Sequence, residues 1–195
     1  MADNKKYFYI VSDFDLTFEE ANPGDFAKFE KYISDFENEL GCEVKICFNS
    51  GTSRKDYEDR LKEFKQKCPE IEKRIDLAVL GNNWIVRKGG ECKTIEREPL
   101  ADKGCALEAL VNNIGRLNMC GLVYMGDCYL DIPAMDYVKE ASRGFGFPAY
   151  SVSPKSFNED RMRKRADFYS CKPRLLGCME GLDQVKEWIL GSQRS

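Results

Sequence analysis

The chain has 195 residues, a length that suits one medium-sized domain with a substantial hydrophobic core. Its 33 acidic and 30 basic residues are interspersed and leave a net charge of -3, so no field of one sign points to a nucleic acid or an anionic membrane as partner. Histidine is absent, which excludes imidazole bases and histidine-ligated metals.

The nine cysteines form no Cys-x-x-Cys pair and are odd in number, which argues against a secreted disulfide framework and a thiolate zinc site. We expect reduced thiols that act mostly as small core residues, with Cys105 and Cys128 as oxidisable exceptions beside the candidate site identified below. The polar amino terminus has no signal-peptide core, and no apolar run approaches the roughly 20 residues of a membrane span. We therefore expect a cytoplasmic protein.

The first predicted element is the apolar strand Tyr7–Val11, which is followed by the sequence Ser-Asp13-Phe-Asp15. Two carboxylates therefore lie where a buried strand opens into a loop. Burying an acid beside a second acid is costly, so the pair favours a cation site or a proton-transfer site. Taken alone, the same residues also fit a solvated turn with one helix-capping aspartate.

A helix is predicted from Asn22 to Gly41. Asn22 can cap this helix, and Pro23 suits its first turn. Apolar residues then recur at helical spacing as far as Gly41. A short apolar run at 44–49 then predicts a buried strand, which ends at Ser50.

A second amphipathic helix should end before Pro69, because the residue before a proline avoids the helical region. Residues 75–80 and 84–87 are separated by a Gly-Asn-Asn turn and predict an antiparallel hairpin, with a second turn at 88–90. We place a small β-hairpin insertion at about 75–97.

A third helix should begin near Asp102 and Lys103 and lead to a strand at 121–125. This strand is followed by Asp127 and then by Asp131, which can cap the next helix.

The last part of the chain predicts strands at 144–152 and 167–170 and a closing amphipathic helix. The basic run at 161–165 has helical spacing, and we interpret it as a solvated face rather than a nucleic-acid site. Strands separated by helices predict a single α/β domain over 1–195. It should have a three-layer, Rossmann-like, doubly wound and mainly parallel sheet, with ligands beyond the carboxyl ends of the strands.

The polar residues at these strand and helix ends occur in a characteristic order. They are Asp13-x-Asp15-x-Thr17, Ser50, Lys103 and Gly126-Asp127-x-x-x-Asp131. This series resembles motifs one to four of the haloacid dehalogenase superfamily of phosphohydrolases, and Ser50-Gly51 resembles the Thr-Gly of its Cof-type branch. The resemblance runs from about Tyr7 to the closing helix.

The resemblance implies a magnesium-dependent phosphatase that hydrolyses a small phosphomonoester, such as a sugar or nucleotide phosphate, through an aspartyl-phosphate intermediate. Asp13 would be the nucleophile and Asp15 the general acid and base. Lys103 would pair with both the nucleophile and the phosphate, while Ser50 and Gly51 would bind phosphoryl oxygens.

The implied ligands of Mg2+ are Asp13, the backbone carbonyl of Asp15, and Asp127, which agrees with the preference of this ion for oxygen. Asp131 would either act as a ligand through water or orient Asp127. Thr17 would fix the loop after the acids by a side-chain to backbone hydrogen bond.

Each residue also has an ordinary structural interpretation. Asp127 and Asp131 could be turn and cap residues, Ser50 a loop hydroxyl and Lys103 a solvated lysine. Their joint order along the chain favours the phosphatase site over these separate roles.

Two residues depart from Cof-type sequences: Thr52 stands where arginine is common, and Leu130 where asparagine is common. The segments between the motifs have no room for a full cap domain, so the site should be open. A neighbouring subunit of a homo-oligomer or a large substrate would then have to cover it. Trp84 and Ile85 of the hairpin are candidates either for an exposed apolar edge or for the core.

Two alternatives to a small-molecule phosphatase remain open. One is a phosphoprotein phosphatase that uses the open site, and the other is a non-catalytic module on the same fold that binds a phosphorylated ligand or a protein partner.

Overall fold

The computed structural model describes residues 5–14, 23–51, 53–80, 84–87, 92–94, 102–156 and 158–192. The strands are β1 (Tyr7–Ser12), β2 (Glu43–Ser50), β3 (Ile75–Leu80), β4 (Trp84–Arg87), β5 (Cys92–Thr94), β6 (Met119–Met125), β7 (Ala149–Ser153) and β8 (Phe168–Tyr169). The helices are α1 (Pro23–Leu40), α2 (Arg54–Lys67), α3 (Pro69–Arg74), α4 (Lys103–Ile114), α5 (Ile132–Phe145), α6 (Glu159–Arg165) and α7 (Arg174–Ser192).

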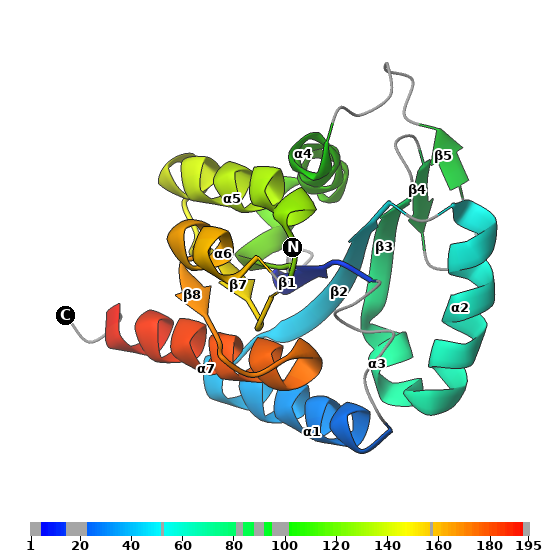
Figure 1. Ribbon diagram of the computed structural model, residues 1–195, viewed down its shortest axis with the longest axis horizontal. Coiled ribbons are helices and arrows are strands. Elements are labelled where there is room, and N and C mark those ends of the chain that lie inside the picture. The colour runs from blue at the N-terminus through cyan, green and yellow to red at the C-terminus, as the bar shows by residue number, and fades with distance from the viewer. Residues whose placement is uncertain are drawn as a thin grey trace.

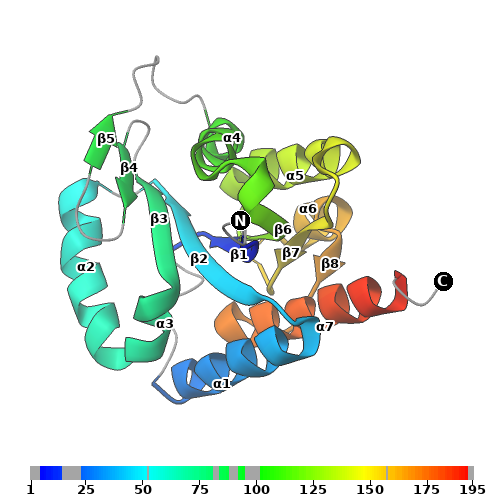
Figure 2. The same ribbon diagram turned by 180° about the vertical axis from the view of Figure 1, so that it is seen from behind.

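The strands form one sheet in the order β5-β4-β3-β2-β1-β6-β7-β8. The six strands β3, β2, β1, β6, β7 and β8 run parallel to one another. The hairpin strands β4 and β5 pair antiparallel at one edge. Helices cover both faces, with α1 and α7 side by side on one face and α4 and α5 on the other (Figures 1 and 2). The predicted three-layer, Rossmann-like fold is therefore confirmed.

The central strand β1 is buried on both faces, as expected for a strand in the middle of a covered parallel sheet. Phe8 and Ile10 face the core cluster that includes α1 and α7, whereas Tyr9 and Val11 face the cluster that includes α4 and α5. Because successive side chains alternate between faces, β1 contributes to both cores. This burial gives the residues at its end a rigid support.

The helix predicted from Asn22 to Gly41 is α1, which starts at Pro23 and ends at Leu40. Gly41 follows with a φ of 65°, the left-handed conformation that glycine adopts readily after a helix. The proposed cap Asn22 lies outside the described residues.

Two local predictions differ from the structure. The short helix α3 was not predicted, and it starts at Pro69, which suits a first helical position. The strand predicted at 144–152 begins only at Ala149, because α5 continues through Phe145. Phe145 is buried at helical spacing from Val138, and the chain turns at Gly146 with a φ of 71°.

The predicted hairpin is present, with β4 antiparallel to β3 and β5 antiparallel to β4. The structure does not describe the side chains of Trp84 and Ile85, so their place at an exposed edge or in the core stays a prediction.

The basic run lies on α6, where Met162 is buried and the basic side chains are exposed. Across the described ranges, every helix is too short or too polar to cross a membrane.

Candidate active site

The predicted acids lie at the carboxyl ends of neighbouring parallel strands. Asp13 directly follows β1, and Asp127 follows β6. Ser12 is in register with Met125, and the backbone N–H of Asp13 donates to the carbonyl of Met125 at 2.9 Å. Ser50 is the last residue of β2, on the other side of β1, and it is 2% exposed. Residues from three adjacent strands therefore share one edge of the sheet.

Lys103 connects two of these acids. Its Nζ lies 2.9 Å from Oδ1 of Asp13 and 2.7 Å from Oδ1 of Asp131. Burial alone would lower the pKa of Lys103, but the negative charges of Asp131 and Asp13 outweigh burial and raise it above its ordinary value. The ammonium therefore stays charged and holds two buried carboxylates together.

The start of α4 fixes the position of Lys103. Asp102 caps this helix, since its carboxylate accepts a hydrogen bond of 3.0 Å from the backbone N–H of Cys105. The side-chain amide of Asn49, on β2, donates to the backbone carbonyl of Lys103 at 2.9 Å. The helix is thus attached to the same strand that carries Ser50.

Gly104 allows α4 to approach α5. A Cβ at this position would lie 2.7 Å from the carbonyl oxygen of Pro133, closer than real contacts allow. The absence of a side chain therefore lets the first turn of α4 lie against the start of α5, where Asp131 accepts a hydrogen bond from Lys103.

Both carboxylate oxygens of Asp131 are engaged. Oδ1 accepts hydrogen bonds from Lys103 Nζ and from the Tyr124 hydroxyl, each at 2.7 Å. Oδ2 accepts from the backbone N–H groups of Asp127 and Cys128, each at 3.1 Å, and from the Cys128 thiol at 3.3 Å. Asp131 is fully buried, so these five donors compensate the cost of removing its charge from water.

Asp131 occupies the predicted N-cap position of α5, but its side chain makes no capping hydrogen bond to this helix. The second residue of α5 is Pro133, which has no backbone N–H to donate. The carboxylate turns back instead and holds the loop that carries Asp127.

Gly126 makes room for this arrangement. A Cβ there would lie 2.4 Å from the carboxyl carbon of Asp131. The N–H of Gly126 also donates to the carbonyl of Val152 on β7 at 3.2 Å, which attaches the loop to the sheet.

Two neutral groups complete the surroundings of Asp131. Burial, together with the charge of Asp131, raises the pKa of Tyr124 well above its ordinary value, so its hydroxyl stays protonated and can donate. The same two causes raise the pKa of Cys128 to about 12. Cys128 is therefore mainly a thiol at neutral pH, which disfavours the oxidation expected for it.

The other predicted residues are only partly described. Gly51 lies at an exposed bend after Ser50. Asp15, Thr17 and Thr52 lie outside the described residues. The structure thus brings together Asp13, Lys103 and Asp131, and it places Ser50, Gly51 and Asp127 at the same edge.

The donor chemistry of this edge fits a hard divalent cation. Asp127, Cys128 and Asp131 each offer one atom within 4.8 Å of the others. Both oxygens of Asp131 already accept hydrogen bonds, and Cys128 carries a protonated thiol. Asp13 and Asp127 are therefore the carboxylates best suited to hold Mg2+. Asp131 is better suited to positioning these groups.

Sequence reasoning missed two supporting residues, Tyr124 and Asn49. Both occur near the ends of apolar strands, and the sequence pattern indicates only that Tyr124 belongs to a buried strand. The available signal was a hydrogen-bonding group just before the polar strand end, since a buried hydroxyl or amide requires a partner.

The apolar rim of the site was also not predicted. Tyr129 and Leu130 follow Asp127 in the motif loop and are 53% and 54% exposed. They lie at the same edge as the buried acids and are available to contact a substrate or another chain.

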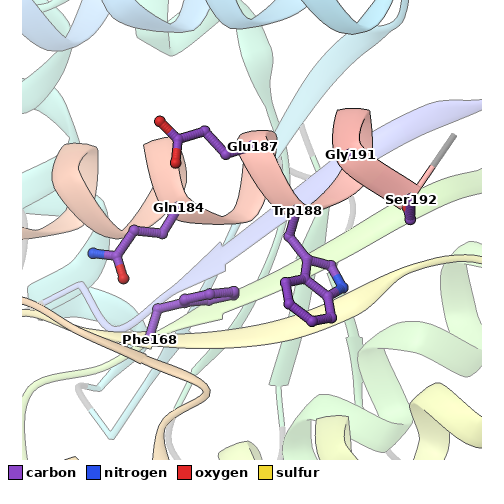
Figure 3. A pocket seen from close by; sticks show the side chains of 6 residues that line it. All are labelled: Phe168, Gln184, Glu187, Trp188, Gly191 and Ser192. Atoms are coloured by element: carbon purple, nitrogen blue, oxygen red, sulfur yellow. The ribbon is translucent and has the colours of Figure 1, made fainter. Parts of the chain in front are cut away.

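A separate pocket of about 610 Å3 lies between α7 and β8. Figure 3 shows Phe168 and Trp188 directed into the same space, with Gln184 beside them. None of the candidate site residues lines this pocket. The pocket is therefore not assigned a part in the chemistry of Asp13.

Comparison with solved structures identifies the fold. The chain resembles yhjK, a haloacid dehalogenase-like hydrolase protein from Bacillus subtilis, with a TM-score of 0.62 and 13% sequence identity over 93% of this chain and 90% of that one. It also resembles the C-terminal domain of the trehalose synthase regulatory protein from Candida albicans, with a TM-score of 0.51 and 11% identity over 91% and 94% of the two chains.

No protein-family model matches the chain, and no curated protein matches its sequence. The structural similarity extends over nearly the whole chain and agrees with the motifs at the ends of β1, β2 and β6. The chain therefore has the fold of the haloacid dehalogenase-like hydrolases.

Proposed function

We propose that this protein is a magnesium-dependent phosphatase that hydrolyses a phosphomonoester through an aspartyl-phosphate on Asp13. The observation that supports this best is the buried cluster in which Lys103 pairs with both Asp13 and Asp131. A buried lysine that stays charged at neutral pH, beside a carboxylate at the carboxyl edge of a parallel sheet, suits the binding of an anionic phosphoryl group.

The chemistry assigned to Asp13 is nucleophilic attack on phosphorus. Its carboxylate forms the new oxygen–phosphorus bond as the ester bond to the leaving alcohol breaks. Lys103 offsets negative charge on the phosphoryl oxygens and restricts the orientation of Asp13. A bound Mg2+ would supply further charge neutralisation, with Asp13 and Asp127 as its carboxylate ligands.

The proton transfers are assigned to Asp15. It would protonate the leaving alcohol and later take a proton from the water that attacks the aspartyl-phosphate, which releases inorganic phosphate and restores Asp13. This role rests on the sequence resemblance and on the lack of histidine in the chain. Ser50, at the end of β2, would donate its hydroxyl to a phosphoryl oxygen.

We further propose that no cap domain covers this site and that 1–195 form a single domain. The described elements between β1 and α4 are helices and strands of the main fold, together with the hairpin strands. The exposed side chains of Tyr129 and Leu130 then form a rim on which a second subunit or a large substrate could close. Light scattering tests whether a second subunit covers the site, and a fully active monomer would argue against such an assembly.

The substrate class depends on how the site is covered. A small phosphomonoester fits if another subunit completes the site, whereas a phosphoprotein fits if the site works open. The second similar structure bears the name of a regulatory protein, so the fold by itself does not decide catalysis. The buried pairing of Lys103 with Asp13 favours an enzyme over a non-catalytic binding module.

Hydrolysis of p-nitrophenyl phosphate with Mg2+ tests the proposed activity. We expect turnover by the wild type and a loss of at least about 100-fold in Asp13→Asn, because the amide is a far weaker nucleophile. A matched control is Asp25→Asn, which changes an acid in the first turn of α1. If wild type and Asp13→Asn are equally inert while both bind phosphate esters, the protein is a binding module.

A further inference from the structure

A small pocket of about 350 Å3 lies between the start of α5 and the helix α6, which follow one another along the same face of the sheet (Figure 1). Its lining consists of Ile132 from α5 and of Arg161, Lys164 and Arg165 from α6. The pocket thus combines one aliphatic side chain with three cationic ones.

The sequence of α6 explains why these cations share one surface. Arg161, Lys164 and Arg165 are spaced by three and four residues, so they lie on one face of the helix, and all three are exposed. Met162 anchors the helix, because it is buried in the core cluster that includes α4 and α5. Like charges at this spacing repel one another, and an anion bound between them would relieve that repulsion.

Only part of this positive charge is offset by the protein. The guanidinium of Arg165 lies 3.2 Å from the carboxylate of Asp136 on α5. Among the residues that the structure describes, the side chains of Arg161 and Lys164 form no ion pair or hydrogen bond, and Asp160 beside them forms no ion pair. Two cations of the pocket are therefore available to an anionic ligand.

The pocket adjoins the loop of the candidate active site. Ile132 directly follows Asp131, whose buried carboxylate belongs to that site. A single turn of 3-10 helix, Tyr129–Asp131, separates Ile132 from the loop that carries Asp127, and such a turn is roughly 6 Å long. The exposed side chains of Tyr129 and Leu130 lie on this turn, between the loop and the pocket.

We propose that Arg161 and Lys164 bind a second acidic group of the substrate, so that the preferred phosphomonoester carries another phosphate or a carboxylate on its leaving group. This inference rests on the proposed phosphatase function. The guanidinium matches the two oxygens of either acid, and the ammonium adds a point charge. The carbon chain that joins the two acids would cross Tyr129 and Leu130 and lie against Ile132.

The size of the pocket limits what it binds. A volume of about 350 Å3 is at the small end of ligand sites, which suits one acidic group and a few carbon atoms rather than a whole metabolite. Two free cations also match one phosphate or carboxylate, whereas a nucleic-acid backbone would need a longer series of contacts. The pocket therefore fits one end of a ligand whose other end lies near Asp13.

The test compares alkyl monophosphates with alkanediol bisphosphates of equal chain length, assayed with Mg2+ at low ionic strength. After correction for its two ester groups, the wild type should prefer the bisphosphate by about 3- to 30-fold in kcat/KM at a chain length that spans the two sites. The double variant Arg161→Gln/Lys164→Gln should lose this preference. Arg163→Gln is the matched control, because Arg163 lies on the same helix, pairs with Glu159 and does not line the pocket.

Binding gives a second measurement that needs no turnover. Calorimetry on Asp13→Asn should show a Kd for the bisphosphate about 3- to 30-fold below that for the monophosphate. Because the cations are exposed, this difference should shrink between about 0.05 M and about 0.5 M salt, which tests the subsite without altering α6.

The outcomes separate the subsite from the proposed function. Equal kcat/KM and equal Kd for the two esters overturn the inference and leave the phosphatase standing. A preference that survives in Arg161→Gln/Lys164→Gln, or that Arg163→Gln abolishes equally, overturns it as well. If free sulfate raises turnover of the monophosphate as much as the second phosphate does, the pocket binds a separate anion and the inference is overturned. An inert wild type whose Asp13→Asn form still binds the bisphosphate more tightly, through Arg161 and Lys164, supports the subsite and contradicts the phosphatase.

Discussion

The hydroxyl of Tyr124 donates a 2.7 Å hydrogen bond to Oδ1 of Asp131, the same oxygen that accepts from Lys103. Replacing Tyr124 by phenylalanine removes this bond and keeps the ring in the core. We expect kcat to fall several-fold with little change in KM, because Lys103 and Asp13 lose part of their restraint. The free energy of unfolding should fall by about 1 to 3 kcal/mol. Steady-state kinetics and thermal unfolding measure both effects, and an unchanged kcat would contradict this positioning role.

The contact between α4 and α5 can be tested at Gly104. In Gly104→Ala, the new Cβ would meet the carbonyl of Pro133 at 2.7 Å, so the helix must shift and move Lys103. We expect a loss of activity of at least about 10-fold and a lower Tm.

The control for this change is Gly144→Ala, also within a helix but with no atom beyond its chain neighbours and its own helix backbone within 4 Å of the new Cβ. This variant should keep its activity and gain up to about 1 kcal/mol in stability from helix propensity. Equal activity in the two alanine variants would show that the close approach at Gly104 does not matter.

Asp127 and Asp131 should respond differently to loss of charge. Asp127→Asn should weaken Mg2+ binding, measured by calorimetry, and change Tm little, because its side chain is half-buried. Asp131→Asn should lower the free energy of unfolding by about 1 to 3 kcal/mol, because it removes one of the two carboxylates that pair with the buried Lys103. A large stability loss in Asp127→Asn with none in Asp131→Asn would reverse these assignments.

The raised pKa values of Lys103 and Tyr124 predict a loss of stability in alkali. Folded Lys103 keeps its proton above the pH at which an unfolded lysine loses it, and Tyr124 behaves in the same way relative to an unfolded tyrosine. Their contributions are therefore complete below about pH 10 and are lost as the pH rises further.

This dependence can be measured by urea unfolding between pH 8 and pH 11. The stability difference between wild type and Tyr124→Phe should stay constant up to about pH 9.5 and shrink above it. A difference that is constant over the whole range would contradict the raised pKa of Tyr124.

Much of the fold could be predicted because local and global signals agree. The apolar runs at β1, β2 and β6 end in polar residues, and parallel strands place such ends at one edge. This rule predicted a common location for Asp13, Ser50 and Asp127 without any contact being known.

The rest depended on tertiary contacts. Tyr124 looks like an ordinary core aromatic until its hydroxyl is seen to meet Asp131, seven residues later. Asp131 has the sequence position of a helix cap, but Pro133 removes a donor and Lys103 supplies a stronger one. Gly144 looked like the start of a strand, whereas burial of Phe145 extends the helix to Gly146.

The cluster formed by Asp13, Lys103 and Asp131 also has a consequence for folding. These residues come from three separate parts of the chain and meet only when α4 docks against the sheet and α5. A partly folded chain without docked α4 would leave both carboxylates without their shared cation. The proposed nucleophile would thus acquire its cationic partner only as the chain completes its fold, so that competence for phosphoryl transfer and completion of folding become a single event.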